Sequence, residues 1–179
     1  MLLLLLAAAV VAAGTVYVVH RIQVARNAGL LASLAREKRE AGKNLEALGL
    51  YARYLSYNPR DAAAQAEFAE LVVDRAERAE ATNDERRFAY NALETAVRKN
   101  PDNGKLRRRL AEWMLRFGRF GDALSELNVL WEQAVAAAPQ ADEAERPDPA
   151  SLALLRAYAL NGQGEYRAAA RSEEHTSEL

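Results

Sequence analysis

The sequence predicts an all-α protein, with an N-terminal transmembrane helix followed by an α-solenoid of stacked helical hairpins. Alanine, leucine, arginine and glutamate dominate the composition, and these residues favour helices. The first nineteen residues carry no charged side chain. Two Asn-Pro pairs separate segments in which apolar residues recur at helical spacing. Because no run of alternating β-branched residues is present, we expect no sheet.

The segment Met1–Val19 is predicted to be a membrane anchor over residues 1–20. Nineteen helical residues span roughly 28 Å, which is close to the hydrocarbon thickness of a bilayer. His20 and Arg21 end the apolar run. A cleaved signal peptide is the alternative, and the small residues 12–14 offer a cleavage site. Against that alternative, no basic residue precedes the run, and the run exceeds the usual 7–15 residues.

The membrane orientation stays open on the sequence. Basic residues follow the apolar segment, which favours a cytoplasmic location for the rest of the chain. A start site further upstream that carried basic residues would reverse this inference.

The charge balance and the missing cysteine exclude several classes of function. The chain has 24 basic and 25 acidic side chains and a net charge of −1, so no global attraction to nucleic acid is expected. Without cysteine, disulfides and thiolate metal sites are excluded.

Helix boundaries are marked along the middle of the chain. Pro59 and Pro101 each stop a helical run, and Asp61 and Asn103 then provide N-caps for the helices that follow. Gly42 interrupts an earlier run and predicts a tight turn between two antiparallel helices. Because one such pair cannot close a core alone, neighbouring pairs are expected to stack.

The segment 28–61 resembles a 34-residue tetratricopeptide repeat (TPR). Tyr54 departs from that pattern, which prefers alanine there, and this predicts looser packing. Three further units resemble the same motif: 62–103, 104–137 and a truncated 148–170. The second has about eight additional residues near 78–84, predicted to lengthen its first helix and loop. The matching residues are Leu31, Leu34, Ala35, Gly42, Ala47, Tyr51, Pro59, Phe68, Ala69, Ala89, Leu93, Ala96, Pro101, Leu110, Ala111, Gly118, Phe120, Ala123, Leu127, Leu154, Leu155, Tyr158, Gly162 and Tyr166.

Two segments are set apart from the repeats. Residues 136–150 are rich in Ala, Pro, Asp and Glu and predict a solvated loop. Residues 171–179, RSEEHTSEL, resemble the translation of a sequencing adapter. The expectation is therefore an artefact at 171–179 that interrupts the second helix of the fourth unit.

No motif for catalysis, cofactor binding or metal binding is predicted, and the chain is expected not to be an enzyme. The two histidines lack metal partners, and the glycines at 162–164 are interpreted as a helix–helix turn. Glu67 and Glu70 are interpreted as exposed surface carboxylates. The basic run 105–109 is interpreted as a solvated helix face, with Trp113 and Phe117 in the core.

The TPR resemblance implies a concave groove lined by the first helix of each pair, and a bacterial membrane-anchored protein–protein interaction scaffold. The groove would be basic on balance, which favours a protein or peptide ligand with carboxylates over nucleic acid or a small-molecule substrate. The family's asparagine-based carboxylate clamp is absent. The alternative is the interaction or regulatory region of a larger enzyme or assembly factor. The implied groove residues are Arg36, Arg39, Glu70, Asp74, Lys105, Arg108, Glu112, Arg116 and Arg156.

Overall fold

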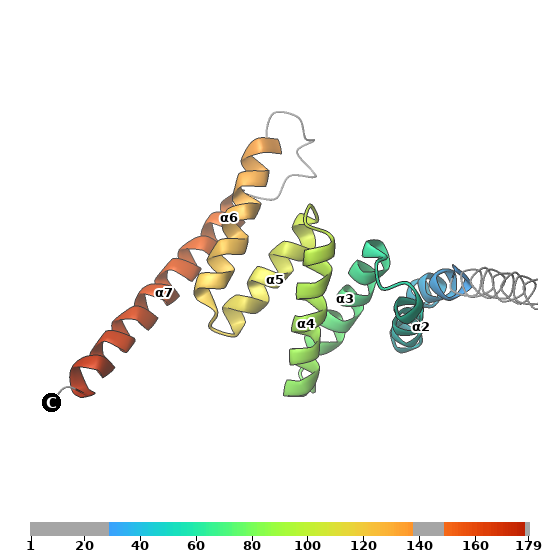
Figure 1. The fold of residues 1–179 in the computed structure, drawn as a ribbon, viewed down its shortest axis with the longest axis horizontal. Coiled ribbons are helices and arrows are strands. Elements are labelled where there is room, and N and C mark those ends of the chain that lie inside the picture. Colours follow the sequence, from blue (N-terminus) through green and yellow to red (C-terminus); the bar gives the residue numbers. More distant parts are fainter. Residues whose placement is uncertain (1–28, 138–148, 178–179) are drawn as a thin grey trace, which may run out of the picture. The chain divides into compact units, whose positions relative to one another are not determined.

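The computed structural model describes residues 29–137 and 149–177, and the ordered elements in these ranges are all helical (Figure 1). This confirms the all-α prediction. The predicted membrane anchor at 1–20 lies outside the described residues. Among the helices of the described part, none is both long enough and apolar enough to cross a bilayer. The elements are a helix at 29–40, α2 (Asn44–Tyr57), α3 (Ala62–Ala76), α4 (Asn83–Lys99), α5 (Gly104–Arg116), α6 (Phe120–Ala137) and α7 (Pro149–Ser177).

The chain divides into two compact units, Met1–Arg75 and Ala76–Leu179. In the first unit, the helix at 29–40, α2 and α3 share a core in which half of the buried residues are alanine. Small side chains let helix backbones approach closely, and Tyr51 is the largest side chain that is completely buried among the described residues of this unit. The buried residues of this core are Ala35, Ala47, Tyr51, Leu55, Ala64 and Leu71.

The turn between α2 and α3 is held by Asp61, as the sequence predicts. Its Oδ1 accepts a hydrogen bond from the Ala64 backbone N–H at 3.0 Å, which caps α3. The Tyr54 hydroxyl donates to the Asp61 Oδ2 at 2.5 Å. Tyr54, the departure from the repeat pattern, therefore links the end of α2 to the start of α3. Both bonds favour the carboxylate, so the pKa of Asp61 lies below its ordinary value, with the Ala64 bond as the larger cause.

Replacing Asp61 with alanine is expected to lower the free energy of unfolding by about 1–2 kcal/mol at pH 7, the usual cost of losing an N-cap. Asp61→Asn keeps an acceptor and should cost less. Because the folded pKa is depressed, the carboxylate stabilises the fold above its unfolded pKa of about 3.9 and loses that effect at lower pH. Urea unfolding followed by circular dichroism at pH 7 and pH 3 checks this. A wild-type advantage over Asp61→Asn that grows on acidification would contradict it.

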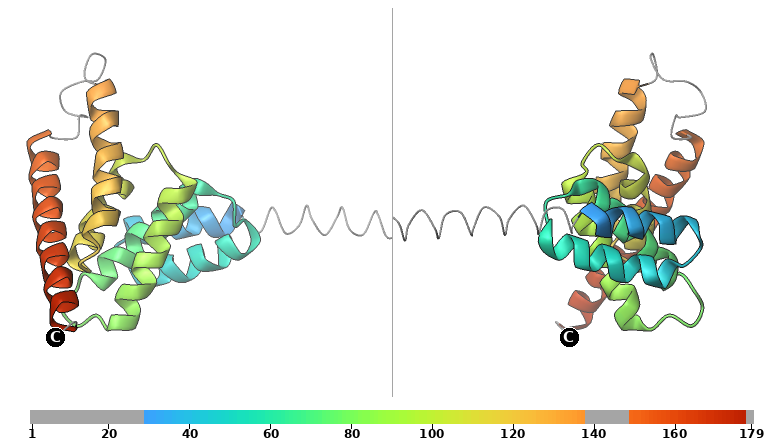
Figure 2. Two further views of the ribbon diagram at one scale, coloured as in Figure 1. Left: turned by 60° about the vertical axis from the view of Figure 1, so that its left-hand side comes forward. Right: turned by 90° about the vertical axis from the view of Figure 1, so that its right-hand side faces the viewer.

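The second unit stacks its helices in chain order. The α4 helix packs on α5, α5 on α6, and α6 on α7, and both Figure 1 and Figure 2 show α6 and α7 running side by side. The turn between α5 and α6 contains Gly118 at a φ of +70°, a backbone conformation that suits glycine. The fully buried large side chains here are Leu93, Leu106, Leu110, Leu127, Leu130 and Leu152.

The additional residues of the second predicted repeat lie where the sequence expects them. The α3 helix has 15 residues against 13 in α5, and six residues at 77–82 connect α3 to α4. Thr82 closes this loop with a capping box, in which it accepts from the Glu85 N–H while Glu85 accepts from the Thr82 N–H. The loop therefore ends at Thr82, where the capping box begins α4.

The predicted turn at residues 162–164 is wrong, because α7 continues through them without a break. A glycine in a helix costs about 1 kcal/mol relative to alanine, but packing can outweigh that cost. Gly162 is buried, and a Cβ there would meet three ring atoms of Phe120 at 2.5–2.7 Å. The missing side chain makes room for Phe120 of α6. Most of the predicted loop at 136–150 lies outside the described residues.

Candidate protein-binding surfaces

In the first unit, three of the predicted groove residues come together: Arg36 and Arg39 pair with carboxylates of α3, and Glu70 is one of these carboxylates. Arg36 Nε donates to Glu67 Oε1 at 3.0 Å, and Arg39 Nη2 donates to Glu70 Oε2 at 2.6 Å. The hydroxyl of the buried Tyr51 also donates to Glu67. Side chains from the helix at 29–40, α2 and α3 thus form one network.

This network corrects the interpretation of Glu67 and Glu70 as exposed surface carboxylates. Their side chains are only 25% and 17% exposed. The bond to Glu67 raises the pKa of Arg36, and burial together with the same carboxylate raises the pKa of Tyr51. These shifts favour the charged form of Arg36 and the neutral form of Tyr51.

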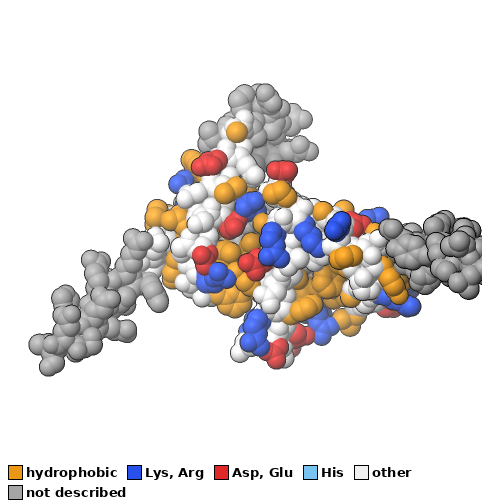
Figure 3. Space-filling view, viewed as in Figure 1, with side chains coloured by type: hydrophobic (Ala, Val, Ile, Leu, Met, Phe, Trp, Pro, Cys, Tyr) orange, Lys and Arg blue, Asp and Glu red, His pale blue; other side chains and the backbone are white. Residues whose placement is uncertain are grey.

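The other predicted groove residues do not form a single open basic patch. Arg108 Nε donates to Glu112 Oε1 at 3.0 Å on the same helix, and the Arg156 guanidinium lies 5.0 Å from the centre of the Trp131 ring. Asp74 and Lys105 are exposed on α3 and α5. On the face drawn in Figure 3, basic and acidic side chains are interspersed.

The basic run at 105–109 is not a solvated face throughout, which corrects the sequence interpretation. Arg107 pairs with Glu126 of α6 and its side chain is 12% exposed, while Arg109 Nη2 donates to Glu77 Oε2 at 2.9 Å. The core assignment is also half wrong. Trp113 is buried as predicted, but Phe117 is 47% exposed. These arginines hold α5 against its neighbours.

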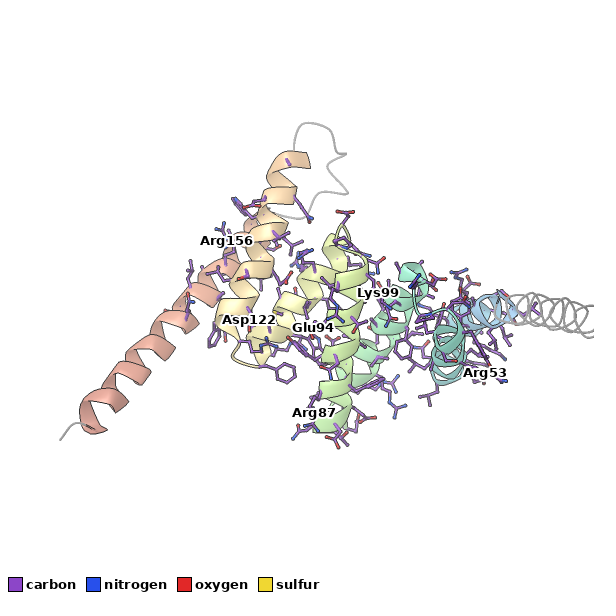
Figure 4. All side chains as sticks on the ribbon, in the orientation of Figure 1. Arg53, Arg87, Glu94, Lys99, Asp122 and Arg156 are labelled. Atoms are coloured by element: carbon purple, nitrogen blue, oxygen red, sulfur yellow. The ribbon has the colours of Figure 1, made fainter. Side chains whose placement is uncertain are left out.

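Two hollows flank the exposed Phe117 in the second unit, and we call their shared lining the Phe117 surface. The first has a volume of about 310 Å³ and is lined by Ala76, Glu77, Arg86, Trp113, Arg116 and Phe117. The second, of about 380 Å³, is lined by Asn83, Arg86, Arg87, Tyr90, Phe117 and Arg119. Arg86 and Phe117 belong to both, so the hollows adjoin. Figure 4 shows Arg87 near the start of α4 and Asp122 at the start of α6.

Aromatic contacts fix the orientation of Phe117. Its ring centre lies 5.8 Å from that of Tyr90 and 5.9 Å from that of Trp113, and both pairs meet edge to face. Arg119 lies over the Tyr90 ring at 5.3 Å and donates to its hydroxyl. Burial raises the pKa of Tyr90, so this ring stays neutral.

Glu77 organises the first hollow from the loop between α3 and α4. Its carboxylate accepts hydrogen bonds from Arg109, from Trp113 Nε1 at 3.2 Å and from Arg116 Nη1 at 3.4 Å. Burial opposes its ionisation, but the bonds from Arg109 and Trp113 outweigh burial and lower the pKa of Glu77. Three side chains of α5 are thereby tied to one carboxylate.

Residues 89–144, which begin in α4 and extend past α6, match the family model described as tetratricopeptide repeat. This part of the chain carries the tetratricopeptide repeat pattern. The fold is similar to that of MamA 41-end from Desulfovibrio magneticus RS-1, with 17% identity and a TM-score of 0.54. A MamA RS-1 double mutant gives 18% identity and the same TM-score. Each match covers 77% of this chain and about two thirds of the other. No curated protein matches the sequence.

The Phe117 surface was not predicted from the TPR resemblance, which directs attention to the first helices of the pairs. Its residues come mainly from the loop at 77–82, the start of α4 and the α5–α6 turn, and α5 adds Trp113 and the predicted groove residue Arg116. One sequence signal points to this surface. The second repeat is lengthened at 78–84, and α4 begins within that segment, at Asn83. Within the ranges that the structure describes, no group of three or more His, Cys, Asp or Glu side chains could hold a metal ion.

Proposed function

We propose that this chain is a non-catalytic scaffold that binds protein partners through its tetratricopeptide repeats. The observation that carries the proposal is the match of residues 89–144 to the repeat family, on helices that stack in chain order. Stacked hairpins of this kind present extended surfaces, and such surfaces suit a peptide or protein ligand better than a small substrate.

We further propose that the partner approaches the first helices of the pairs, at the nine groove residues derived from the sequence. Ion pairing limits how strongly these residues can bind a ligand, since Arg36 and Arg39 already bind Glu67 and Glu70. An acidic ligand there would have to compete with these carboxylates for the same guanidinium groups. A ligand that bridges Arg36, which is half exposed, and the neighbouring solvated residues fits this constraint.

Residues 1–20 are proposed to anchor the repeats in a bacterial membrane as a single helix, on either face. The support is the absence of charge over Met1–Val19 and a length that fits the bilayer. Carbonate extraction of bacterial membranes that contain the full chain should leave it in the pellet. Release into the supernatant would count against the anchor.

A displayed library of random peptides, panned against the full chain in detergent micelles, tests the scaffold. We expect the recovered peptides to converge on a shared pattern, and a synthetic copy to bind with a Kd near the micromolar range, about −8 kcal/mol. Micelles without protein are the control. If no peptide is enriched over this control, the scaffold proposal is wrong.

A further inference from the structure

We infer that the Phe117 surface is a second docking site, which shares Arg116 with the proposed first-helix groove but is centred on Phe117, for an acidic peptide segment of a partner protein that carries a large apolar side chain. This inference rests on the scaffold proposal and specifies where and by what chemistry one partner binds. Its basis is the combination of two adjoining hollows, an exposed aromatic ring between them and arginines around both.

The shape of the surface suits the side chains of a peptide. Each hollow has a volume at the lower end of the range for small-ligand sites, which is the size of one or two side chains. Because the hollows share Phe117 and Arg86, a single extended segment can cross the Phe117 ring and enter both. Covering the ring is also favourable, because Phe117 is 47% exposed and a ligand would remove this apolar surface from water.

The ring is also ordered before a ligand arrives. Tyr90 and Trp113 each meet it edge to face, and Trp113 is held in turn by its hydrogen bond to Glu77. A partner that covers Phe117 therefore loses little additional side-chain entropy on the receptor side, and such preorganised aromatic residues are common binding hot spots.

The charges of the surface favour carboxylates on the ligand. Four arginines line the hollows, namely Arg86, Arg87, Arg116 and Arg119. Three carboxylates offset them in part: Asp84 pairs with Arg87, Asp122 pairs with Arg119, and Glu77 is shared by Arg116 and Arg109. Counting these groups together with Arg109 gives five positive and three negative charges. Glu94 and the Arg107–Glu126 ion pair lie nearby, and including them leaves a small surplus of six positive to five negative charges. The positive surplus attracts an acidic segment.

The same counting disfavours nucleic acid as the occupant. Stacking aromatics beside arginines also occur in single-strand binding sites. Here the three carboxylates lie among the arginines, and a continuous row of phosphates would pass close to them and be repelled. The chain as a whole also carries a net charge of −1. A peptide with one apolar side chain flanked by carboxylates has no such continuous row, so the positions of its charges can vary more freely.

The test uses the full chain in detergent micelles and a fluorescein-labelled synthetic peptide with one central phenylalanine flanked by aspartates and glutamates. Fluorescence anisotropy should give saturable binding. Replacing the peptide phenylalanine with alanine, or its acids with asparagine and glutamine, should each weaken binding by about tenfold or more. A labelled oligo-dT of similar length is the nucleic-acid probe. Tighter binding of oligo-dT than of the acidic peptide would overturn the inference.

Matched variants locate the site. Phe117→Ala and Arg86→Glu should each weaken peptide binding by about tenfold or more. Two control variants change α4 outside the hollows. Phe88→Ala removes a different exposed ring, and Arg98→Glu reverses a different exposed charge. These two controls should stay within about twofold, and circular dichroism should show unchanged helicity in all four.

The outcomes separate this inference from the scaffold proposal. If the panned peptides bind but are insensitive to Phe117→Ala and Arg86→Glu, the second site is wrong and the scaffold proposal stands. If the acidic probe binds and responds to both variants while no panned peptide responds to changes at the nine groove residues, the Phe117 surface is supported and the first-helix groove is not. Equal loss in the control variants overturns the second site.

Discussion

Replacing Leu127 with alanine is expected to lower the free energy of unfolding of the second unit by about 2–5 kcal/mol. Leu127 is fully buried in α6, which packs on α5 on one side and α7 on the other. The substitution removes buried apolar atoms and leaves a cavity that the neighbouring helices fill only in part. Thermal unfolding of the full chain, followed by circular dichroism, should show a midpoint lower by roughly 5–15 °C.

Val129→Ala provides the matched control on the same helix. Val129 is 36% exposed, so its truncation removes fewer buried contacts and should shift the midpoint by much less. Amide hydrogen exchange adds a local measure, because protection should fall in α5, α6 and α7 before it falls in α2. Equal shifts for the two variants would mean that Leu127 is not a core residue.

Gly162→Leu is expected to destabilise the packing of α7 on α6 by about 1–3 kcal/mol, although leucine favours a helix more than glycine does. The reason is steric, because the position of the added Cβ is occupied by the Phe120 ring. Gly164, two residues further along α7, has nothing within 4 Å of its Cβ position. Gly164→Leu should therefore raise stability, by up to about 1 kcal/mol.

A double-mutant cycle identifies the cause of the Gly162 effect. In a Phe120→Ala background the ring is gone, so Gly162→Leu should become neutral or stabilising. The thermal midpoints of the wild type, the two single variants and the double variant give the coupling free energy between the two positions. If Gly162→Leu has the same effect with and without Phe120, the two residues do not share the space between α6 and α7.

Most of the fold could be predicted because its signals are local. Asp61 and Asn103 cap helices through bonds to residues three positions later, and Gly42 and Gly118 adopt positive φ at the predicted turns. The failure at residues 162–164 has a different origin. A glycine is compatible with a turn or with close helix packing, and only the position of Phe120, 42 residues earlier, distinguishes them.

The contacts of the surface side chains were harder to predict, because they also depend on residues that are distant in the sequence. Helical spacing places Trp113 and Phe117 on one face of α5, but burial depends on what lies opposite each ring. Glu77, in a loop, bonds to Trp113 from 36 residues away and helps leave Phe117 at the edge of the packed surface. Likewise, the sequence alone assigns the arginines of the run 105–109 to solvent, because the partner of Arg107 lies on α6 and the partner of Arg109 lies in the loop at 77–82. Ion pairs between helices have no local sequence signal.

The neighbour-to-neighbour order of α4, α5, α6 and α7 has a consequence for how such a chain can change its length. Within this unit α5 packs on α4 and α6, and α6 packs on α5 and α7. Duplication of one hairpin-coding segment would therefore insert a unit whose two faces resemble the faces it separates, and no distant contact would have to be rebuilt. An array of this kind can lengthen by whole hairpins while the older ones keep their structure.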